Sequence, residues 1–171
     1  MTSNKRNTHS AVLYVTYGGI IAALYVALTY VSAAFGLASG VIQVRISEAL
    51  TILPIFTPAA VPGLFVGCLL SNILTGCALW DVVFGSIATL LGAVFTYLLR
   101  KYKWVAPVPP IVANVLIIPF VLRYVYEVPD GIPYLMLTVG IGEVISCGVL
   151  GTLLTVAVGK RGSRIFRTGS K

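Results

Sequence analysis

The stretch VIQVRISEALTILPIF, from Val41 to Phe56, decides how many times the chain is expected to cross a membrane. Arg45 and Glu48 stand at its start, although only 10% of the residues in the chain are charged. The helix expected over 47–57 has about 11 residues, which at ~1.5 Å per residue gives about 16 Å. This length is roughly half the thickness of a hydrocarbon core. Whether the segment crosses must therefore be judged from the rest of the chain.

Long uncharged runs fill most of the remaining sequence. Of the 171 residues, 58% are hydrophobic, against roughly 45–50% in soluble domains. Runs of about 20 apolar residues are typical of helices that span a membrane. The sequence predicts an all-α membrane protein with a single domain over 1–171 and loose cytoplasmic tails at 1–10 and 160–171. The expected helices cover 11–37, 47–57, 59–76, 82–100, 105–125 and 133–159.

The basic residues favour a membrane crossing by the segment 47–57. Cytoplasmic loops of membrane proteins carry an excess of Lys and Arg. If the segment crosses, every basic residue except Arg45 and Arg123 lies on the cytoplasmic side. If it does not cross, the basic loop 100–103 and the basic C-terminal tail face outward instead. The sequence therefore predicts six transmembrane helices with the N and C termini in the cytoplasm.

The same arrangement places the acidic residues on the outward side or in the outer half of a helix. A site with acidic groups beside apolar walls favours a ligand that donates hydrogen bonds or carries positive charge. For Glu127 and Asp130, which are expected in a loop, ordinary solvated charges are the alternative interpretation. The acidic residues are Glu48, Asp81, Glu127, Asp130 and Glu143.

Glu143 lies inside the last apolar segment, in TVGIGEVISCGVLG. An ionisable group within a membrane segment is costly and marks a candidate functional site. An ion pair with Arg45 or Arg123 is the structural alternative. If Ser47 caps the helix, the helix dipole stabilises the Glu48 carboxylate in the first turn. An ion pair between Arg45 and Glu48 would then explain both charges without a ligand.

Two further stretches hold candidate residues. In SNILTGCALWDVVFG, Asp81 is typical of a helix N-cap and Trp80 of an interfacial aromatic residue. Alternatively, Trp80 stacks on a planar ring while Asn72 and Asp81 bind the polar edge of that ring. On the first helix, a stripe of small residues allows another helix to approach closely, either within the bundle or from a partner subunit. The stripe consists of Gly19, Ala23 and Ala27.

Recognisable signatures of enzymes do not occur in the sequence. There is no GxxxxGK[ST] phosphate loop, and there is no HExxH or GxSxG pattern. The three cysteines form no CxxC pair and sit among apolar neighbours, so packing is expected of them rather than metal binding. We therefore expect a transport or binding protein, not an enzyme, with no metal site and no nucleic-acid partner.

Three stretches together resemble the QueT family, which is assigned to the uptake of queuosine precursors. They are VRISEALTILP, LWDVVFGSIATLLGA and GEVISCGVLG. The resemblance implies an S component, the substrate-binding subunit of an energy-coupling factor (ECF) transporter in the plasma membrane of a prokaryote. Such a subunit associates with a transmembrane coupling subunit and with two ATPase subunits that use ATP and Mg. The chain itself needs no cofactor, and the small-residue stripe becomes the surface expected to dock on the coupling subunit.

The resemblance also implies a ligand, a 7-deazaguanine such as the nitrile preQ0 or the aminomethyl compound preQ1. Its guanine-like edge presents a ring N–H and an amine side by side, which a carboxylate can accept. Glu48 and Glu143 are the candidates for this clamp. Arg45 or Asn72 would donate to the carbonyl oxygen of the ligand.

The remaining roles follow from the same ligand. Asp81 is available for a cationic aminomethyl arm, and Trp80 or Tyr134 could stack on the ring. Two alternatives stay open at this point. The chain could be an S component for another vitamin or nucleobase, or a stand-alone secondary transporter coupled to protons through Glu143.

Overall fold

The computed structural model describes residues 2–38 and 42–159, and this part of the chain contains helices and no strands. The helices η1 and η2 are 3₁₀ helices, and η3 is a π helix that joins α5 and α6 into one rod. The all-helical prediction is therefore confirmed. The elements are α1 (Thr2–Ala34), η1 (Ile46–Ile55), α2 (Ala60–Leu74), α3 (Leu79–Leu98), η2 (Lys103–Val105), α4 (Val108–Tyr124), α5 (Ile132–Glu143), η3 (Val144–Leu150) and α6 (Gly151–Gly159).

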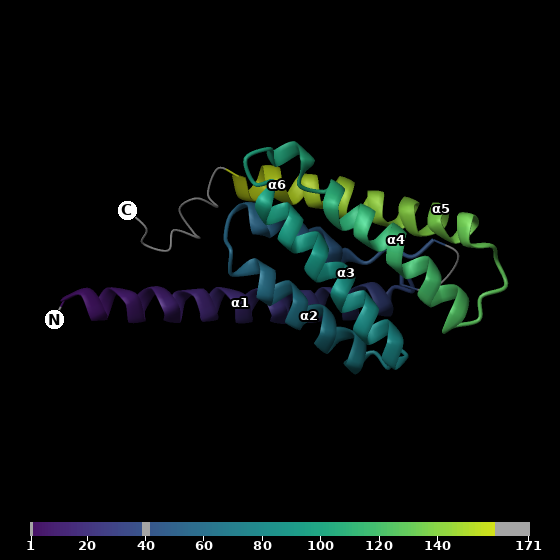
Figure 1. The fold of residues 1–171 in the computed structure, drawn as a ribbon, viewed down its shortest axis with the longest axis horizontal. Coiled ribbons are helices and arrows are strands. Elements are labelled where there is room, and N and C mark those ends of the chain that lie inside the picture. Colours follow the sequence, from purple (N-terminus) through teal and green to yellow (C-terminus); the bar gives the residue numbers. More distant parts are fainter. Residues whose placement is uncertain (1, 39–41, 160–171) are drawn as a thin grey trace.

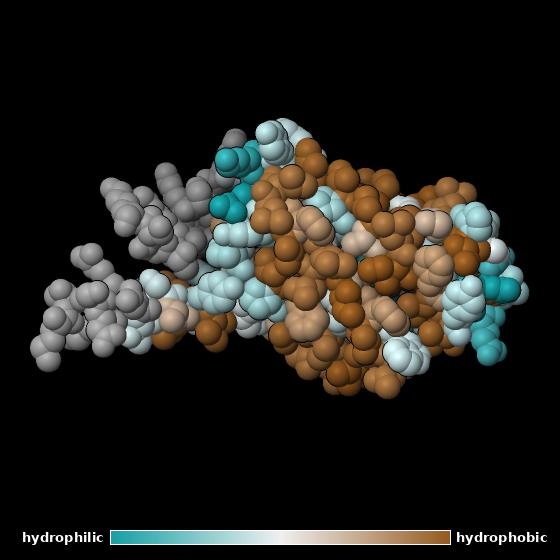
Figure 2. Space-filling model, viewed as in Figure 1, coloured by the Kyte–Doolittle hydropathy of each residue, from teal (hydrophilic) through white to brown (hydrophobic). Residues whose placement is uncertain are grey.

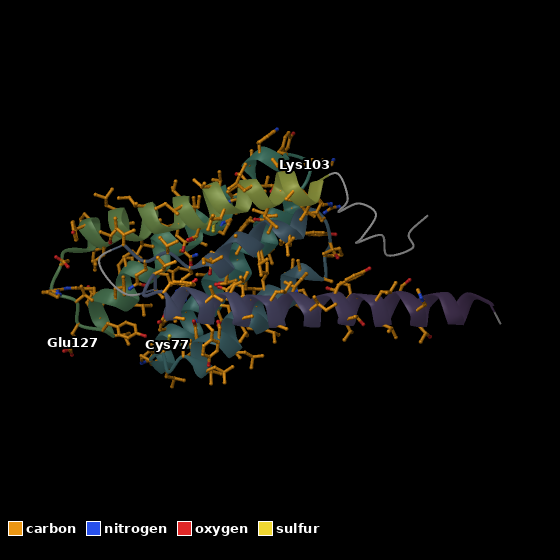
Figure 3. All side chains as sticks on the ribbon, turned by 180° about the vertical axis from the view of Figure 1, so that it is seen from behind. Cys77, Lys103 and Glu127 are labelled. Carbon is orange, nitrogen blue, oxygen red and sulfur yellow. The ribbon has the colours of Figure 1, made fainter. Side chains whose placement is uncertain are left out.

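The elements α1, η1, α2, α3 and α4 and the rod formed by α5, η3 and α6 run in alternating directions along one bundle (Figure 1). The helices α1 to α5 pack against their neighbours in sequence, and η1 lies among α1, α3, η3 and α6. The start of α1 and the end of α6 point toward the same end of the bundle (Figure 1). Lys103 lies at that end, whereas Cys77 and Glu127 lie at the opposite end (Figure 3). The bundle therefore has one end that bears a basic loop and another that bears an acidic one.

Four helical stretches are long and apolar enough to cross a membrane, while η1 and α2 are apolar but shorter. Hydrophobic side chains cover the middle of the visible face, and hydrophilic ones gather toward its ends (Figure 2). Together these features identify a multi-pass membrane protein. The six-crossing topology and the cytoplasmic termini remain predictions. The four long stretches are Thr8–Ala34, Leu79–Leu98, Lys103–Tyr124 and Ile132–Gly159.

The first helix begins earlier than the sequence predicted. Residues 2–10, expected as a loose tail, form the first turns of α1. These residues include neither proline nor glycine, and polar side chains do not by themselves end a helix. The second predicted tail, at 160–171, lies outside the described residues.

The segment predicted as the short second helix is a 3₁₀ helix in the centre of the bundle. At ~2.0 Å per residue, such a helix is longer for its residue number than an α-helix. Residues 47–54 are all buried, so η1 faces other helices rather than lipid. Ser47 is not its N-cap, because η1 is preceded by Arg45 and has no side-chain cap. The Ser47 hydroxyl instead accepts a hydrogen bond from Thr29 Oγ1 at 2.9 Å.

Glycines allow α1 and α2 to approach closely, which supports a first prediction. A Cβ added at Gly67 would lie 2.8 Å from Tyr25 Cβ, whereas nothing lies within 4 Å of a Cβ added at Gly19. Gly67→Ala is therefore expected to destabilise the fold by about 1–3 kcal/mol, which lowers Tm by several degrees. Gly19→Ala should leave Tm unchanged. Thermal unfolding in detergent measures both, and equal Tm values for the two variants would refute the close packing.

Candidate functional site

A small polar cavity lies inside the bundle, bounded by the segment before η1 and by η1, α2, α3, α4 and α5. Its volume is about 40 Å³. Because a buried water requires roughly 10–15 Å³, the cavity in this conformation has room for a few water molecules. The lining residues are Gln43, Arg45, Glu48, Cys68, Gly85, Thr89, Asn114, Ile118, Val139 and Glu143.

Glu48 is the most unusual of these residues. Its side chain is 3% exposed, and the Tyr25 hydroxyl donates a hydrogen bond to its Oε1 atom. The second oxygen, Oε2, is buried and has no hydrogen-bond partner among the described residues. Buried carboxylate oxygens are normally paired, because desolvation without a partner is costly. Glu48 therefore presents an unused acceptor at the cavity.

Arg45 brings a positive charge to the same cavity. Its Nη1 atom donates to Asn72 Oδ1 at 3.3 Å, and Asn72 is 1% exposed. Within the described ranges no hydrogen bond or ion pair joins Arg45 to Glu48 or Glu143, so the Arg45–Glu48 pair that the sequence left open as an alternative does not form. Asn72 is thus a residue that orients the guanidinium, while its own oxygen is already occupied.

Glu143, at the junction between α5 and η3, is another charged residue that lines the cavity. The Cys147 thiol donates to Glu143 Oε2 at 3.2 Å, and Asn114 lines the same cavity. Because Glu143 and Cys147 are four residues apart on one rod, both face η1, where Thr51 Oγ1 lies 3.4 Å from Cys147 Sγ. A π-helical segment such as η3 often occurs at a functional site. Arg123 is not the partner of Glu143, since it donates to the Val128 carbonyl at 2.8 Å.

A metal ion could be held by the same side chains. One donor atom each from Glu48, Glu143 and Cys147 lies within 4.8 Å of the others. The sequence did not point to this cluster, because the three residues are not in a recognisable metal-binding pattern. The expectation that the chain binds no metal remains a prediction.

The structure places Asp81 beside the cavity rather than in its lining. Asp81 is 6% exposed and lies in the first turn of α3, whose N-cap position is Ala78, so it is not the predicted N-cap. The Tyr126 hydroxyl donates to Asp81 Oδ2 at 2.8 Å. Partial burial raises the pKa of the Tyr126 phenol well above its usual range, and the Asp81 carboxylate raises it further. Tyr126 therefore stays a donor to Asp81 at physiological pH.

The two aromatic candidates lie outside the cavity lining. Trp80 is 58% exposed and stacks on Phe84, with ring centroids 5.9 Å apart, in an apolar groove between α3 and α4. Tyr134 lines a different, outer cavity. The structure thus brings together Arg45, Glu48, Asn72 and Glu143, but not Trp80 or Tyr134.

Several polar residues of the site were not singled out from the sequence. Gln43, Cys68 and Thr89 line the cavity, and Thr89 Oγ1 donates to Cys68 Sγ at 3.3 Å. Tyr25 holds Glu48 from α1. These residues could have been identified as isolated polar side chains within otherwise apolar helices. Such side chains tend to face the interior of a membrane helix bundle.

Comparison with known proteins gives one match. Residues 15–160 match the family model described as QueT transporter. Neither the curated proteins nor the solved structures gave a match.

Proposed function

Because this chain belongs to the QueT transporter family, we propose that it is the S component of an ECF importer and that it binds a 7-deazaguanine queuosine precursor. The family is one of transporters, and the helical bundle is that of a membrane protein. The observation that carries the ligand proposal is the buried Oε2 atom of Glu48 at the polar cavity, which has no hydrogen-bond partner in the described part of the chain. An unused carboxylate oxygen in a buried cavity is suited to a ligand that donates hydrogen bonds.

The polar groups of the cavity match a guanine-like edge. The ring N–H and the exocyclic amine would donate to Glu48, through Oε2 and the remaining lone pair of Oε1, with Glu143 beside them. The ligand carbonyl would accept from Arg45, whose guanidinium is oriented by Asn72. Ile118 and Val139 offer apolar contacts to the ring faces.

The small-residue stripe on α1 supports docking on a coupling subunit. Gly19, Ala23 and Ala27 are all exposed, while other small residues of α1 pack against α2. In the proposed complex the coupling subunit would contact this stripe, and the two ATPase subunits would supply the energy from ATP and Mg. The chain would then operate within the lipid bilayer of a prokaryotic plasma membrane.

A bulky side chain within the small-residue stripe is expected to prevent docking on the coupling subunit without affecting ligand binding. Ala23→Trp should reduce co-purification with the coupling subunit at least tenfold, because close helix approach requires small residues. Leu24→Trp is the matched control, since its position is about 100° away around the helix and is already occupied by an exposed apolar side chain. Equal co-purification of the two variants would show that the stripe faces lipid instead.

Uptake into proteoliposomes tests the proposed function against its alternative. We expect uptake of a labelled 7-deazaguanine only when the chain is reconstituted with its coupling and ATPase subunits and supplied with ATP. A stand-alone transporter would instead take up the compound with the chain alone and a proton gradient, and Glu143→Gln would abolish that uptake. Uptake of another vitamin or nucleobase, but not of a 7-deazaguanine, would favour an S component of different specificity.

A further inference from the structure

A second cavity lies directly outside the polar one. Its volume is about 230 Å³, and it lies between the end of α4, the following loop and the first half of α5. Gln43 and Val139 line both cavities, so these two residues separate them. The residues that line the outer cavity are Gln43, Leu122, Val128, Asp130, Tyr134, Leu135, Thr138 and Val139.

The inner cavity alone is too small for a bicyclic ligand. Its volume of about 40 Å³ compares with the roughly 300 Å³ or more that is typical of small-molecule sites. The outer cavity supplies most of the missing space. A ligand whose polar edge reaches Glu48 must therefore extend into the outer cavity, and the boundary between the two cavities must open.

The Gln43 side chain is the part of this boundary that is free to move. Its backbone carbonyl is packed against Gly142, where an added Cβ would lie 2.1 Å from the oxygen. The backbone nearby is held by hydrogen bonds from the Val44 amide to the Leu37 carbonyl and from the Ile46 amide to Ser32 Oγ, both at 2.8 Å. The Gln43 side chain itself makes no hydrogen bond within the described ranges. This side chain is therefore free to rotate while the backbone stays in place.

The lining of the outer cavity carries a carboxylate, that of Asp130. Asp130 is the one charged residue among the described residues of this lining and is exposed. In the same described part of the chain it has neither an ion pair nor a hydrogen bond. The nearby Arg123 guanidinium donates to the Val128 carbonyl. A carboxylate without a partner in a partly enclosed space attracts a cation.

We propose that the outer cavity is a second subsite, which holds a short cationic arm of the ligand beside Asp130 after the Gln43 side chain has turned aside. This inference rests on the proposed function. In an aminomethyl 7-deazaguanine, the amine arm is on the five-membered ring and the donor edge is on the six-membered ring. The edge therefore binds at Glu48 while the arm extends outward to Asp130, the role that the sequence had suggested for Asp81.

Calorimetric titration of two variants with the aminomethyl and the nitrile compound tests this subsite. In Asp130→Asn, the affinity for the aminomethyl compound is expected to fall about three- to fivefold, as for a solvent-accessible ion pair, and to become insensitive to salt. The affinity for the uncharged nitrile compound should not change. Glu127→Gln is the matched control, because it removes an exposed carboxylate of the same loop that does not line the cavity. Equal affinities of Asp130→Asn and Glu127→Gln for the aminomethyl compound would overturn the proposal.

A third variant tests the movement of Gln43. Gln43→Ala removes the side chain that must turn aside, so both compounds should associate faster in stopped-flow measurements and bind with higher affinity. A loss of affinity for both compounds would show that Gln43 holds a ligand confined to the inner cavity, which contradicts the two-subsite arrangement.

The wild-type titration separates failure of the subsite from failure of the function. Tight binding of the nitrile compound by wild type, with no effect of Asp130→Asn on either compound, would overturn the subsite and leave the proposed function intact. Binding of neither compound by a folded wild-type chain would overturn both.

Discussion

Replacing Glu48 with glutamine is expected to reduce the affinity for the 7-deazaguanine about a hundredfold. An amide keeps one oxygen, which can still accept the hydrogen bond from the Tyr25 hydroxyl, so the fold should persist. The other position becomes an NH₂ group that faces the donors of the ligand. Loss of a charge-assisted hydrogen bond together with unsatisfied buried donors costs ~3 kcal/mol, which corresponds to about two orders of magnitude in Kd. Calorimetric titration measures the change.

Two comparisons make this result specific. Glu127→Gln removes a carboxylate in the α4–α5 loop at the far end from Lys103 (Figure 3) and should bind like wild type. Glu143→Gln should also weaken binding, but less, because Glu143 already accepts a hydrogen bond from the Cys147 thiol. Full affinity in Glu48→Gln would remove Glu48 from the binding site.

Replacing Gly142 with alanine is expected to lower both stability and ligand affinity. The added Cβ would lie 2.1 Å from the Gln43 carbonyl oxygen and 3.1 Å from its carbon. These are backbone atoms, so no side-chain rotation can relieve the contact, and the segment that carries Arg45 must shift. We expect a destabilisation of about 1–3 kcal/mol and at least a tenfold loss of affinity, measured by thermal unfolding and by calorimetry.

Gly140→Ala is the matched control on the same helix. Its added Cβ would meet Val115 Cγ2 at 3.5 Å, an ordinary van der Waals contact, so Tm and affinity should stay close to wild type. Equal Tm values and equal ligand affinities for Gly142→Ala and Gly140→Ala would show that the segment before η1 does not lie against α5.

The general architecture could be predicted from the sequence because long apolar helices leave a strong signal. The last rod, expected over 133–159, extends from Ile132 to Gly159, and α2 lies within the predicted 59–76. The form of η1 could not be predicted, since a short apolar run containing Pro54 does not distinguish a 3₁₀ helix from an α-helix. Its location in the bundle centre depends on tertiary packing, which a single sequence does not display.

The site could be predicted in part, for a related reason. Glu48 and Glu143 stand out because a charge in an apolar segment is rare, and the structure places both at the same cavity. Trp80 and Asp81 were selected by residue type, but the rotation of α3 turns Trp80 outward and Asp81 toward Tyr126. Gln43 and Thr89 are ordinary polar residues in sequence, and only their three-dimensional arrangement identifies them.

Calorimetric titration of the detergent-purified wild-type chain with the aminomethyl and nitrile 7-deazaguanines shows whether the chain binds a ligand of this class. Biotin, thiamine and riboflavin serve as controls, and thermal unfolding verifies that the chain is folded. We expect nanomolar binding of a 7-deazaguanine and no binding of the three vitamins. Absence of binding to either deazaguanine by the folded chain, or tight binding of one of the vitamins instead, would contradict this expectation.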